Sequence, residues 1–284
     1  MSTVQITASD VNKLRQQTGA GMMDCKKALT ESNGDFEAAI DYLRKKGAKV
    51  AASRQDRELN EGVVIARTTN DGTRGVLIEL NCETDFVAKN AAFIAFANEI
   101  ANRAVEEKPA DIAALTALGV DVDNSRLTIG DAILDQTGKI GEKISISKYE
   151  VLEGTRVVPY IHGNFRLGVL VALNVVAEGV DEAGKDVAMQ IAAMNPVAID
   201  KGDVDATTIQ RELDIAKEQI RAEGKPEEMV EKISQGKLNK FYKDSTLLNQ
   251  EFVKDSSKTI TQFLNGVEKG LTVTAFKRVA LGAA

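Results

Sequence analysis

Residues able to carry out covalent or phosphate chemistry are few in this sequence. His162 is the only histidine, so no Ser-His-Asp or Cys-His catalytic arrangement can be built without it. The segment Gly179–Asp186 reads GVDEAGKD and nearly fits a phosphate-binding loop, but Asp186 stands where a Ser or Thr should ligate Mg²⁺. Asp181 and Glu182 would also repel phosphate groups. These residues give little support to a nucleotide site or to a nucleophilic enzyme.

The two cysteines, Cys25 and Cys82, lie far apart and form no C-x-x-C pair. This spacing favours neither a disulfide framework nor a zinc site, and it predicts two small buried residues. Carboxylates are abundant but scattered, so no acid–base pair can be chosen among them. We therefore expect no catalytic residue, no cofactor and no metal.

One stretch stands out for position rather than reactivity. Asn81–Lys89 reads NCETDFVAK, between an apolar run, Gly75–Leu80, and a helical pattern, Ala91–Val105. A strand therefore ends here and a helix begins, with Asp85 as the predicted N-cap. Phe86 lies beside that cap. It either folds back into the core as a hydrophobic staple or stands at the surface as a contact residue.

Composition indicates an ordinary soluble globular protein. The chain has 284 residues, of which 43% are hydrophobic and 27% charged, enough for about two domains. The net charge of −6 disfavours a nucleic-acid partner, since the basic runs Arg44–Lys49 and Lys237–Lys243 are short. The longest apolar run, Gly168–Ala177, is too short to cross a bilayer. The start, MSTVQITASD, does not resemble a signal peptide, so we expect a cytoplasmic protein.

The first fifty residues predict a module of three short helices. The first two expected helices run from Thr7 or Ser9 to Gln17 and from Met22 to Glu31. The third, capped by Asp35, runs from Phe36 to Lys46, and Gly47 is expected to end that helix. Such a bundle, residues 1–50, is of the ubiquitin-associated type, and residues 51–61 read as a linker. Met22 and Met23 are adjacent, so both cannot face one core. The exposed one either fills a gap or forms a soft docking contact.

The middle of the chain contains an internal repeat. Gly62–Asn81 and Thr155–Asn174 each hold a β-prone segment, a loop, a G-V-L run and a final asparagine, and a helix follows each. Ile144–Val151 and Leu271–Val279 alternate with period two and predict a further strand for each copy. The fold class is therefore α+β, with a duplicated core of two small antiparallel sheets and flanking helices. The copies cover residues 62–154, and 155–195 with 246–284.

An insertion at residues 196–245 interrupts the second copy. It predicts a helix over Asp205–Glu223, a turn, and a second helix that starts with Pro226 at its first position and ends near Lys243. Apolar residues at Ile209, Leu213, Ala216 and Ile220, with Met229, Val230, Ile233 and Phe241 in the second helix, give a helical hairpin with a coiled-coil seam. The hairpin packs internally or pairs with another chain, so a homodimer stays open.

Two motifs carry a resemblance to a known family. TDFV at Thr84–Val87 and TGAGMMDCKKAL at Thr18–Leu29 resemble the hallmarks of bacterial elongation factor Ts, and the likeness extends over nearly the whole chain. The resemblance implies a cytoplasmic guanine nucleotide exchange factor that binds elongation factor Tu·GDP and promotes GDP release without making or breaking a bond. Longer members continue into a carboxy-terminal helical module, and this sequence stops at Leu281–Ala284, so we expect one partner contact fewer.

The resemblance also implies which residues contact elongation factor Tu. An Asp-Phe pair enters the G domain near its Mg²⁺ site and disturbs the phosphate-binding region, a second domain of Tu is also bound, and neither nucleic acid nor membrane takes part. We call Thr84–Val87 the wedge turn. The implied partner-binding residues are Thr84, Asp85, Phe86 and Val87 in the wedge turn, Met22 and Met23 as an amino-terminal dock, Ile140 and Gly141 in K-I-G-E, and His162 in Y-x-H-G.

Two other classes of function stay open from the residues alone. An enzyme could hold its site in a cleft between the two repeat copies, since clefts between domains often bind ligands. A plain scaffold of the ubiquitin-associated type would explain the first fifty residues but not the duplicated core. Binding to elongation factor Tu with faster nucleotide release separates the exchange factor from both.

Overall fold

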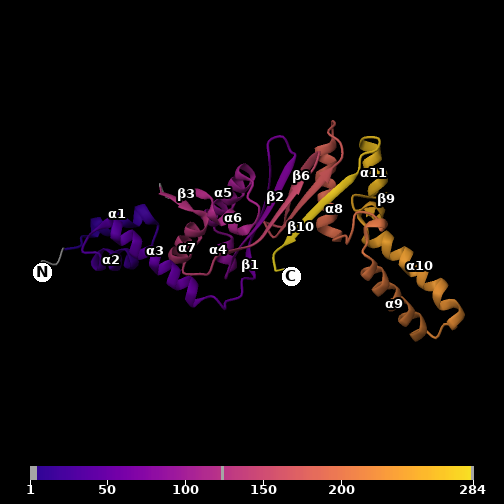
Figure 1. Ribbon diagram of the computed structural model, residues 1–284, viewed down its shortest axis with the longest axis horizontal. Helices are drawn as coiled ribbons and strands as arrows, with labels where there is room; N and C mark the ends of the chain where they lie inside the picture. The colour runs from indigo at the N-terminus through magenta and orange to yellow at the C-terminus, as the bar shows by residue number, and fades with distance from the viewer. Residues whose placement is uncertain (1–4, 123–124, 283–284) are drawn as a thin grey trace.

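The computed structural model describes residues 5–122 and 125–282, so the first four residues of the segment tested for a signal peptide lie outside it. The molecule is long, with three helices at one end, the sheets in the middle and a pair of helices at the other end (Figure 1). This is the predicted α+β arrangement, with small antiparallel sheets and flanking helices. None of the described helices has the length and apolar character needed to cross a bilayer.

The amino-terminal module contains α1 (Ala8–Thr18), α2 (Met22–Glu31) and α3 (Phe36–Ser53). Thr7 begins α1 with a capping box to Asp10, and the Asp35 carboxylate accepts from the backbone N–H of Ala38 to begin α3. The module has a small core of its own, which includes Leu14, Cys25, Ala28, Leu29 and Leu43. The three predicted helices are therefore present.

The predicted end of α3 at Gly47 is wrong. The helix runs on to Ser53, so the predicted linker is helical over its first three residues. Gly47 does not end the helix because its role is close approach: it is buried against α7 (Ile129–Ile140). A Cβ on Gly47 would collide with the Leu134 carbonyl, and one on Gly138 would lie 2.9 Å from the Gly47 Cα. Two glycines thus let the helices cross at backbone contact.

The first sheet has the strand order β1-β2-β5. Its strands are β1 (Glu61–Thr68), β2 (Arg74–Cys82) and β5 (Ser145–Glu153), all antiparallel. Between β2 and β5 the chain forms α4 (Asp85–Ala88), α5 (Ala91–Glu107), α6 (Ile112–Ala117), a β3–β4 hairpin (Gly119–Val122 and Ser125–Thr128) and α7. The core joins the sheet to α5 and α7 through buried side chains such as Ile65, Ile78, Phe93, Ile100 and Ile129.

The second sheet has the same internal order, with its middle strand second in sequence and its last strand beside it. Its strands are β6 (Arg156–His162), β7 (Leu167–Leu173) and β10 (Val273–Ala280). It is flanked by α8 (Val180–Met194) and α11 (Ile260–Val267), with a small hairpin of β8 (Glu251–Phe252) and β9 (Asp255–Thr259) and 3₁₀ turns at Lys201–Asp203 and Leu247–Asn249. The hairpins β3–β4 and β8–β9 were not predicted.

The two sheets contact each other reciprocally. The backbone N–H of Val64 donates to the carbonyl of Phe165 at 2.7 Å, and the N–H of Val157 donates to the carbonyl of Gly72 at 2.6 Å. When the two copies are aligned with Asn81 matched to Asn174, Val64 matches Val157 and Gly72 matches Phe165. Each copy therefore makes the same bond to the other.

Apolar side chains fill the joint between the sheets in the same reciprocal way. A Cβ on Gly75 would meet the side chains of Val157 and Leu170, and a Cβ on Gly168 would meet those of Val64 and Leu77. These four large side chains belong to one buried cluster. This packing fills much of the space between the copies. A small hollow of about 150 Å³ remains at the joint, lined by residues of both copies such as Asn70, Arg156 and Asp181.

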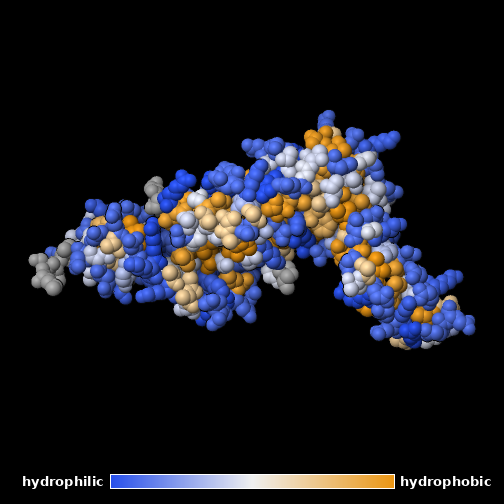
Figure 2. Space-filling view, in the orientation of Figure 1, coloured by the Kyte–Doolittle hydropathy of each residue, from blue (hydrophilic) through white to orange (hydrophobic). Residues whose placement is uncertain are grey.

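The inserted helices, α9 (Ala206–Ala222) and α10 (Glu227–Ser245), form the predicted pair. Ala216, Ile220, Val230 and Leu238 are buried between them. Met229 is 47% exposed, contrary to prediction, because its neighbour Val230 takes the inward position and adjacent helical residues do not share a face. Pro226 precedes the first residue of α10 instead of being it. Figure 2 shows mostly hydrophilic residues on the outer face of this pair.

Candidate functional site

The wedge turn begins where β2 leaves the first sheet. Thr84 is the N-cap of α4, because its hydroxyl accepts from the backbone N–H of Val87 at 3.5 Å. The predicted cap, Asp85, is instead the first helical residue, and its carboxylate accepts from the Lys89 ammonium at 2.6 Å. That hydrogen bond lowers the pKa of Asp85, so the carboxyl group is ionised at neutral pH.

Phe86 points into solvent, with 83% of its side chain exposed. The staple interpretation is therefore wrong, because the ring contributes nothing to the core. Its neighbour Val87 is half-buried against the first-sheet core, and Ala88 is buried. The turn thus has one side anchored in the protein and one aromatic side chain directed outward.

Cys82 supports the turn from beneath. Its thiol donates to the carbonyl of Thr84 at 3.2 Å, and the side chain is fully buried, as predicted. Burial, with the nearby negative charge of Glu142, raises the pKa of Cys82 to about 12. The thiol is therefore a protonated packing group. Cys25, the other described cysteine, is also buried and not in a disulfide.

The end of α7 lies against the wedge turn. Gly141 ends the helix with φ 81°, and Ile140 beside it is 37% exposed. The next residue, Glu142, accepts hydrogen bonds from Glu83 and Thr84. The structure therefore brings Ile140 and Gly141, predicted from another part of the sequence, next to Thr84–Val87.

Met22 and Met23 are both exposed at the first turn of α2, by 52% and 75%. The prediction that at least one faces solvent is confirmed. Their module meets α7 at the Gly47–Gly138 crossing and at Gly19, where an added Cβ would lie 3.6 Å from the Lys139 side chain. The module with the methionines therefore contacts α7, and Glu142, which follows the end of α7, bonds the wedge turn.

His162 ends β6 and is exposed. Its Nδ1 lies 2.9 Å from the Tyr160 hydroxyl, and a turn with positive φ at Gly163, Asn164 and Phe165 follows. His162 belongs to the second sheet, and its described hydrogen bond goes to Tyr160. Among the described residues, no hydrogen bond joins His162 to the wedge turn.

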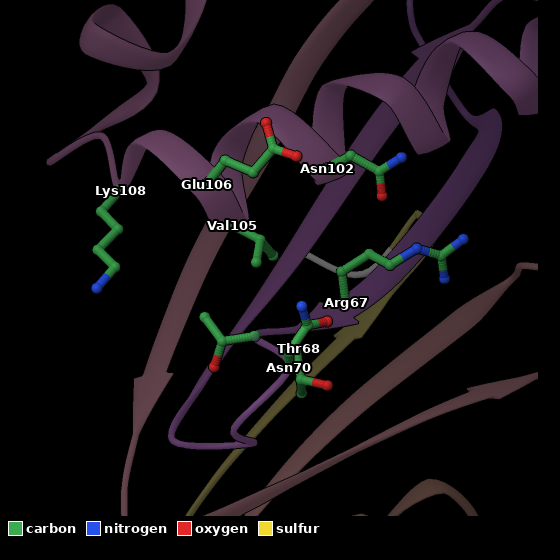
Figure 3. A pocket seen from close by; sticks show the side chains of 8 residues that line it. Arg67, Thr68, Asn70, Asn102, Val105, Glu106 and Lys108 are labelled. Carbon is green, nitrogen blue, oxygen red and sulfur yellow. The ribbon is translucent and has the colours of Figure 1, made fainter.

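One polar hollow of the described surface holds no catalytic arrangement. A hollow of about 350 Å³ between the end of β1 and α5 is lined by Arg67, Asn102, Glu106 and their neighbours. Figure 3 shows that the polar ends of these side chains point in different directions instead of converging on one point. Among residues 5–122 and 125–282, no group of three His, Cys, Asp or Glu side chains could hold a metal ion.

The segment that nearly fits a phosphate-binding loop forms the start of α8. Gly179 precedes the helix, and Gly184 lies inside it against Val158. Asp181 forms a bidentate ion pair with Arg156, and the Asp186 carboxylate accepts a hydrogen bond from the Lys254 ammonium at 2.6 Å. Asp181 and Glu182 lie in the first turn of α8, where their negative charges oppose the binding of a phosphate.

Sequence reasoning missed the residues that hold the wedge turn, which are Glu83, Glu142 and Arg54. Glu142 is 58 residues from Thr84 in the chain, so no local pattern connects the two. The signal available was weak: an acidic residue directly after a glycine that ends a helix.

Comparison with known proteins identifies the family. A family model for elongation factor TS matches residues 83–283. Elongation factor Ts of Cytophaga hutchinsonii is 59% identical over 282 residues, which cover 99% of this chain and 100% of that protein. Those of Flavobacterium psychrophilum and Amoebophilus asiaticus are 52% and 53% identical, and each alignment covers 98% of this chain and 99% of the relative. The exposed aromatic turn and this likeness along the whole chain lead to one conclusion: the chain belongs to the elongation factor Ts family.

Proposed function

We propose that the wedge turn is the element with which this protein releases guanine nucleotide from elongation factor Tu. Elongation factor Ts proteins are nucleotide exchange factors for elongation factor Tu, and they act by binding, not as enzymes. The observation that carries the proposal is the 83% exposure of Phe86 on an anchored turn. A rigidly held aromatic side chain left in water is suited to fill a pocket of a partner.

The Asp85–Phe86 pair enters the G domain of elongation factor Tu near its Mg²⁺ site. The ring of Phe86 wedges between helices, where burial of the aromatic surface supplies binding energy. Asp85 arrives ionised, since the Lys89 hydrogen bond lowers its pKa. A carboxylate brought beside the Mg²⁺ and phosphate-binding region changes the field that holds the nucleotide. Together the two side chains loosen GDP.

Exchange then follows from thermodynamic linkage. Because the factor lowers the affinity of Tu for GDP, GDP lowers the affinity of Tu for the factor by the same ratio. The complex is therefore transient, and GTP refills the emptied site as the factor leaves. No step requires a nucleophile, a general base or a cofactor on this chain.

The remaining predicted residues extend the contact. Met22 and Met23 form the amino-terminal dock, and their exposure of 52% and 75% leaves flexible apolar surface for a partner. Ile140 and Gly141 contact Tu beside the wedge turn. His162 adds a contact to the G domain from the second sheet. Another part of this long molecule reaches a second domain of Tu (Figure 1).

We also infer the finer organisation of the chain. Residues 1–50 form a module of the ubiquitin-associated type, and the core is one α+β unit duplicated, which the shared strand order and the reciprocal bonds support. Residues 196–245 form a coiled-coil hairpin, whose exposed Ile215 and Met229 provide a surface for a homodimer. We place the protein in the cytoplasm, with neither nucleic acid nor membrane as a partner.

The test is the release of a fluorescent GDP from elongation factor Tu. Tu loaded with the labelled nucleotide is mixed in a stopped-flow instrument with this protein and excess unlabelled GDP. We expect release to accelerate with factor concentration, and Phe86→Ala to reduce the acceleration at least about tenfold, since loss of an aromatic anchor costs about 2–4 kcal/mol.

Val253→Ala is the matched control, because Val253 is also an exposed apolar residue, at 48%, but lies on the β8–β9 turn. Its release kinetics should equal those of the wild type. If Phe86→Ala accelerates GDP release as much as the wild type does, the exchange function stands but the wedge turn is not its cause. Absence of acceleration with a cognate Tu would overturn the exchange function itself.

A further inference from the structure

The wedge turn is held by the carboxylate of Glu142. Glu142 Oε2 accepts from the backbone N–H of Glu83 at 3.2 Å and of Thr84 at 3.0 Å, and Oε1 accepts from the Thr84 hydroxyl at 2.7 Å. Thr84 is also the N-cap of α4 and accepts from the N–H of Val87. Because the Thr84 hydroxyl donates its hydrogen bond to Glu142, the oxygen lone pairs of that hydroxyl are turned toward the helix.

A second carboxylate makes the connection reciprocal. The Glu83 side chain accepts from the backbone N–H of Lys143 at 2.7 Å and from Arg54 Nη1 at 2.6 Å. Each acid thus accepts a backbone N–H from the other segment: Glu83 from Lys143, and Glu142 from Glu83. We call this arrangement the Glu83–Glu142 clasp. Arg54 directly follows α3, so the clasp also reaches the end of the amino-terminal module.

The start of the wedge turn needs such support, because Val87 and Ala88 anchor only its end in the core and the Cys82 thiol adds one weak hydrogen bond to the Thr84 carbonyl. The helix α4 has four residues, and a helix of one turn is not stable in isolation. The Phe86 ring makes no core contact that would set its direction. Charge-assisted hydrogen bonds are shorter and stronger than neutral ones, and Glu142 supplies three acceptor contacts to the two residues before Asp85.

We propose that Glu142 is a positioning residue for nucleotide exchange: it holds the wedge turn so that Phe86 meets its pocket on elongation factor Tu without first becoming ordered. This inference rests on the proposed role of the wedge turn. Ordering a contact segment in advance removes the entropy that would otherwise be lost on binding. Glu142 acts through the clasp and not by touching the nucleotide.

The test is a double-mutant cycle on GDP release. Glu142→Ala removes all three acceptor contacts, and we expect the release rate constant per factor to fall about tenfold. In the Phe86→Ala background the same substitution should change release by less than about twofold, because no ring remains to be positioned. Glu142→Gln retains an acceptor oxygen and a neutral hydrogen-bonding group, so most of the activity should return.

Glu150→Ala is the matched control, since Glu150 is a β5 carboxylate paired with Lys277 at 2.8 Å, and it should leave release unchanged. Unfolding midpoints and circular dichroism identify any variant that fails to fold. In that case Glu142→Asp carries the cycle in place of Glu142→Ala, because it keeps the charge but is one methylene too short to reach all three donors. If Glu142→Ala lowers the GDP-release rate constant equally with and without Phe86, the proposed positioning role is overturned, because Glu142 would then act independently of the ring. An unchanged rate in folded Glu142→Ala would overturn it too. If Phe86→Ala alone has no effect, the wedge proposal falls first and this inference falls with it.

Discussion

Phe86 and Phe93 lie seven positions apart and have opposite surroundings: the first is 83% exposed and the second 3% exposed. We expect Phe86→Ala to change the free energy of unfolding by less than about 0.5 kcal/mol, because an exposed side chain loses little packing. Phe93→Ala should lower the same free energy by about 3–5 kcal/mol. Urea unfolding followed by circular dichroism measures both. A large loss for Phe86→Ala would mean that the ring packs on the protein.

Cys82 should make stability depend on pH in the alkaline range. Its pKa is about 12 in the fold, whereas an unfolded thiol ionises near about 8.5. The neutral thiol therefore stabilises the fold fully below pH of about 8.5, and this contribution is lost as the pH rises toward 12, at about 1.4 kcal/mol per pH unit.

The measurement compares wild type with Cys82→Ala by urea unfolding at pH 7.5 and pH 10. Lysines and tyrosines titrate in both proteins, so the difference between the two proteins isolates the thiol. Wild type should lose its advantage over Cys82→Ala on going to the higher pH. A constant difference would show that the thiol does not titrate on unfolding.

At this scale the sequence predicted identities better than orientations. The pattern located the helix start and gave Asp85 as its cap, whereas the cap is Thr84, whose backbone is extended while Asp85 is already helical. It could not decide whether Phe86 packs or projects, since a helix start does not fix the side on which a flanking ring falls. Glu142 stayed hidden because its partners are distant in sequence.

At the scale of elements, the crossing of α3 and α7 makes a specific prediction. Gly138→Ala places a methyl group 2.9 Å from the Gly47 backbone, so the helices must separate, and we expect the free energy of unfolding to fall by about 1–3 kcal/mol. Gly236→Ala is the control, because Gly236 lies within α10 with open space around it. That change should raise stability by up to about 1 kcal/mol through helix propensity.

Thermal and urea unfolding of both variants check this contrast. Two stabilised proteins would mean that α3 and α7 separate freely at the crossing. Because α7 ends at the wedge turn, Gly138→Ala should also slow nucleotide release, whereas Gly236→Ala should not.

The sequence predicted the six main strands and most helices because their apolar periodicity is long enough to read. The hairpins β3–β4 and β8–β9 escaped because strands of two to five residues carry too little pattern. Gly47 misled the prediction of the end of α3 for a physical reason: glycine serves both as a helix terminator and as a point of close helix contact. Only the position of α7 in space distinguishes the two roles.

At the scale of the whole molecule, the helical pair α9–α10 lies at the opposite end from the amino-terminal module (Figure 1). Two backbone hydrogen bonds join the segments that lead into and out of the pair. The Val197 N–H donates to the Ser245 carbonyl and the Leu247 N–H donates to the Ala198 carbonyl, both at 2.9 Å. We expect that replacing residues 206–244 by a short Gly-Ser linker leaves the core folded and leaves the maximal rate of GDP release unchanged.

Circular dichroism and the stopped-flow assay check this, and sedimentation velocity of both proteins tests the proposed homodimer. A lower maximal rate would assign the pair to the Tu contact. A wild-type dimer that becomes monomeric after the deletion would confirm the pair as the dimer surface.

The reciprocal contact between the two sheets bears on how many partner molecules one chain binds at the same time. Because the two copies contact each other through the same surface, each has an equivalent turn between its second strand and the helix that follows. A protein with two identical copies would therefore carry two wedge turns. Here the second copy passes from Asn174 to α8 through Val175–Gly179, a segment without an aromatic residue. If the wedge turn acts as proposed, we expect each chain to open one nucleotide site at a time.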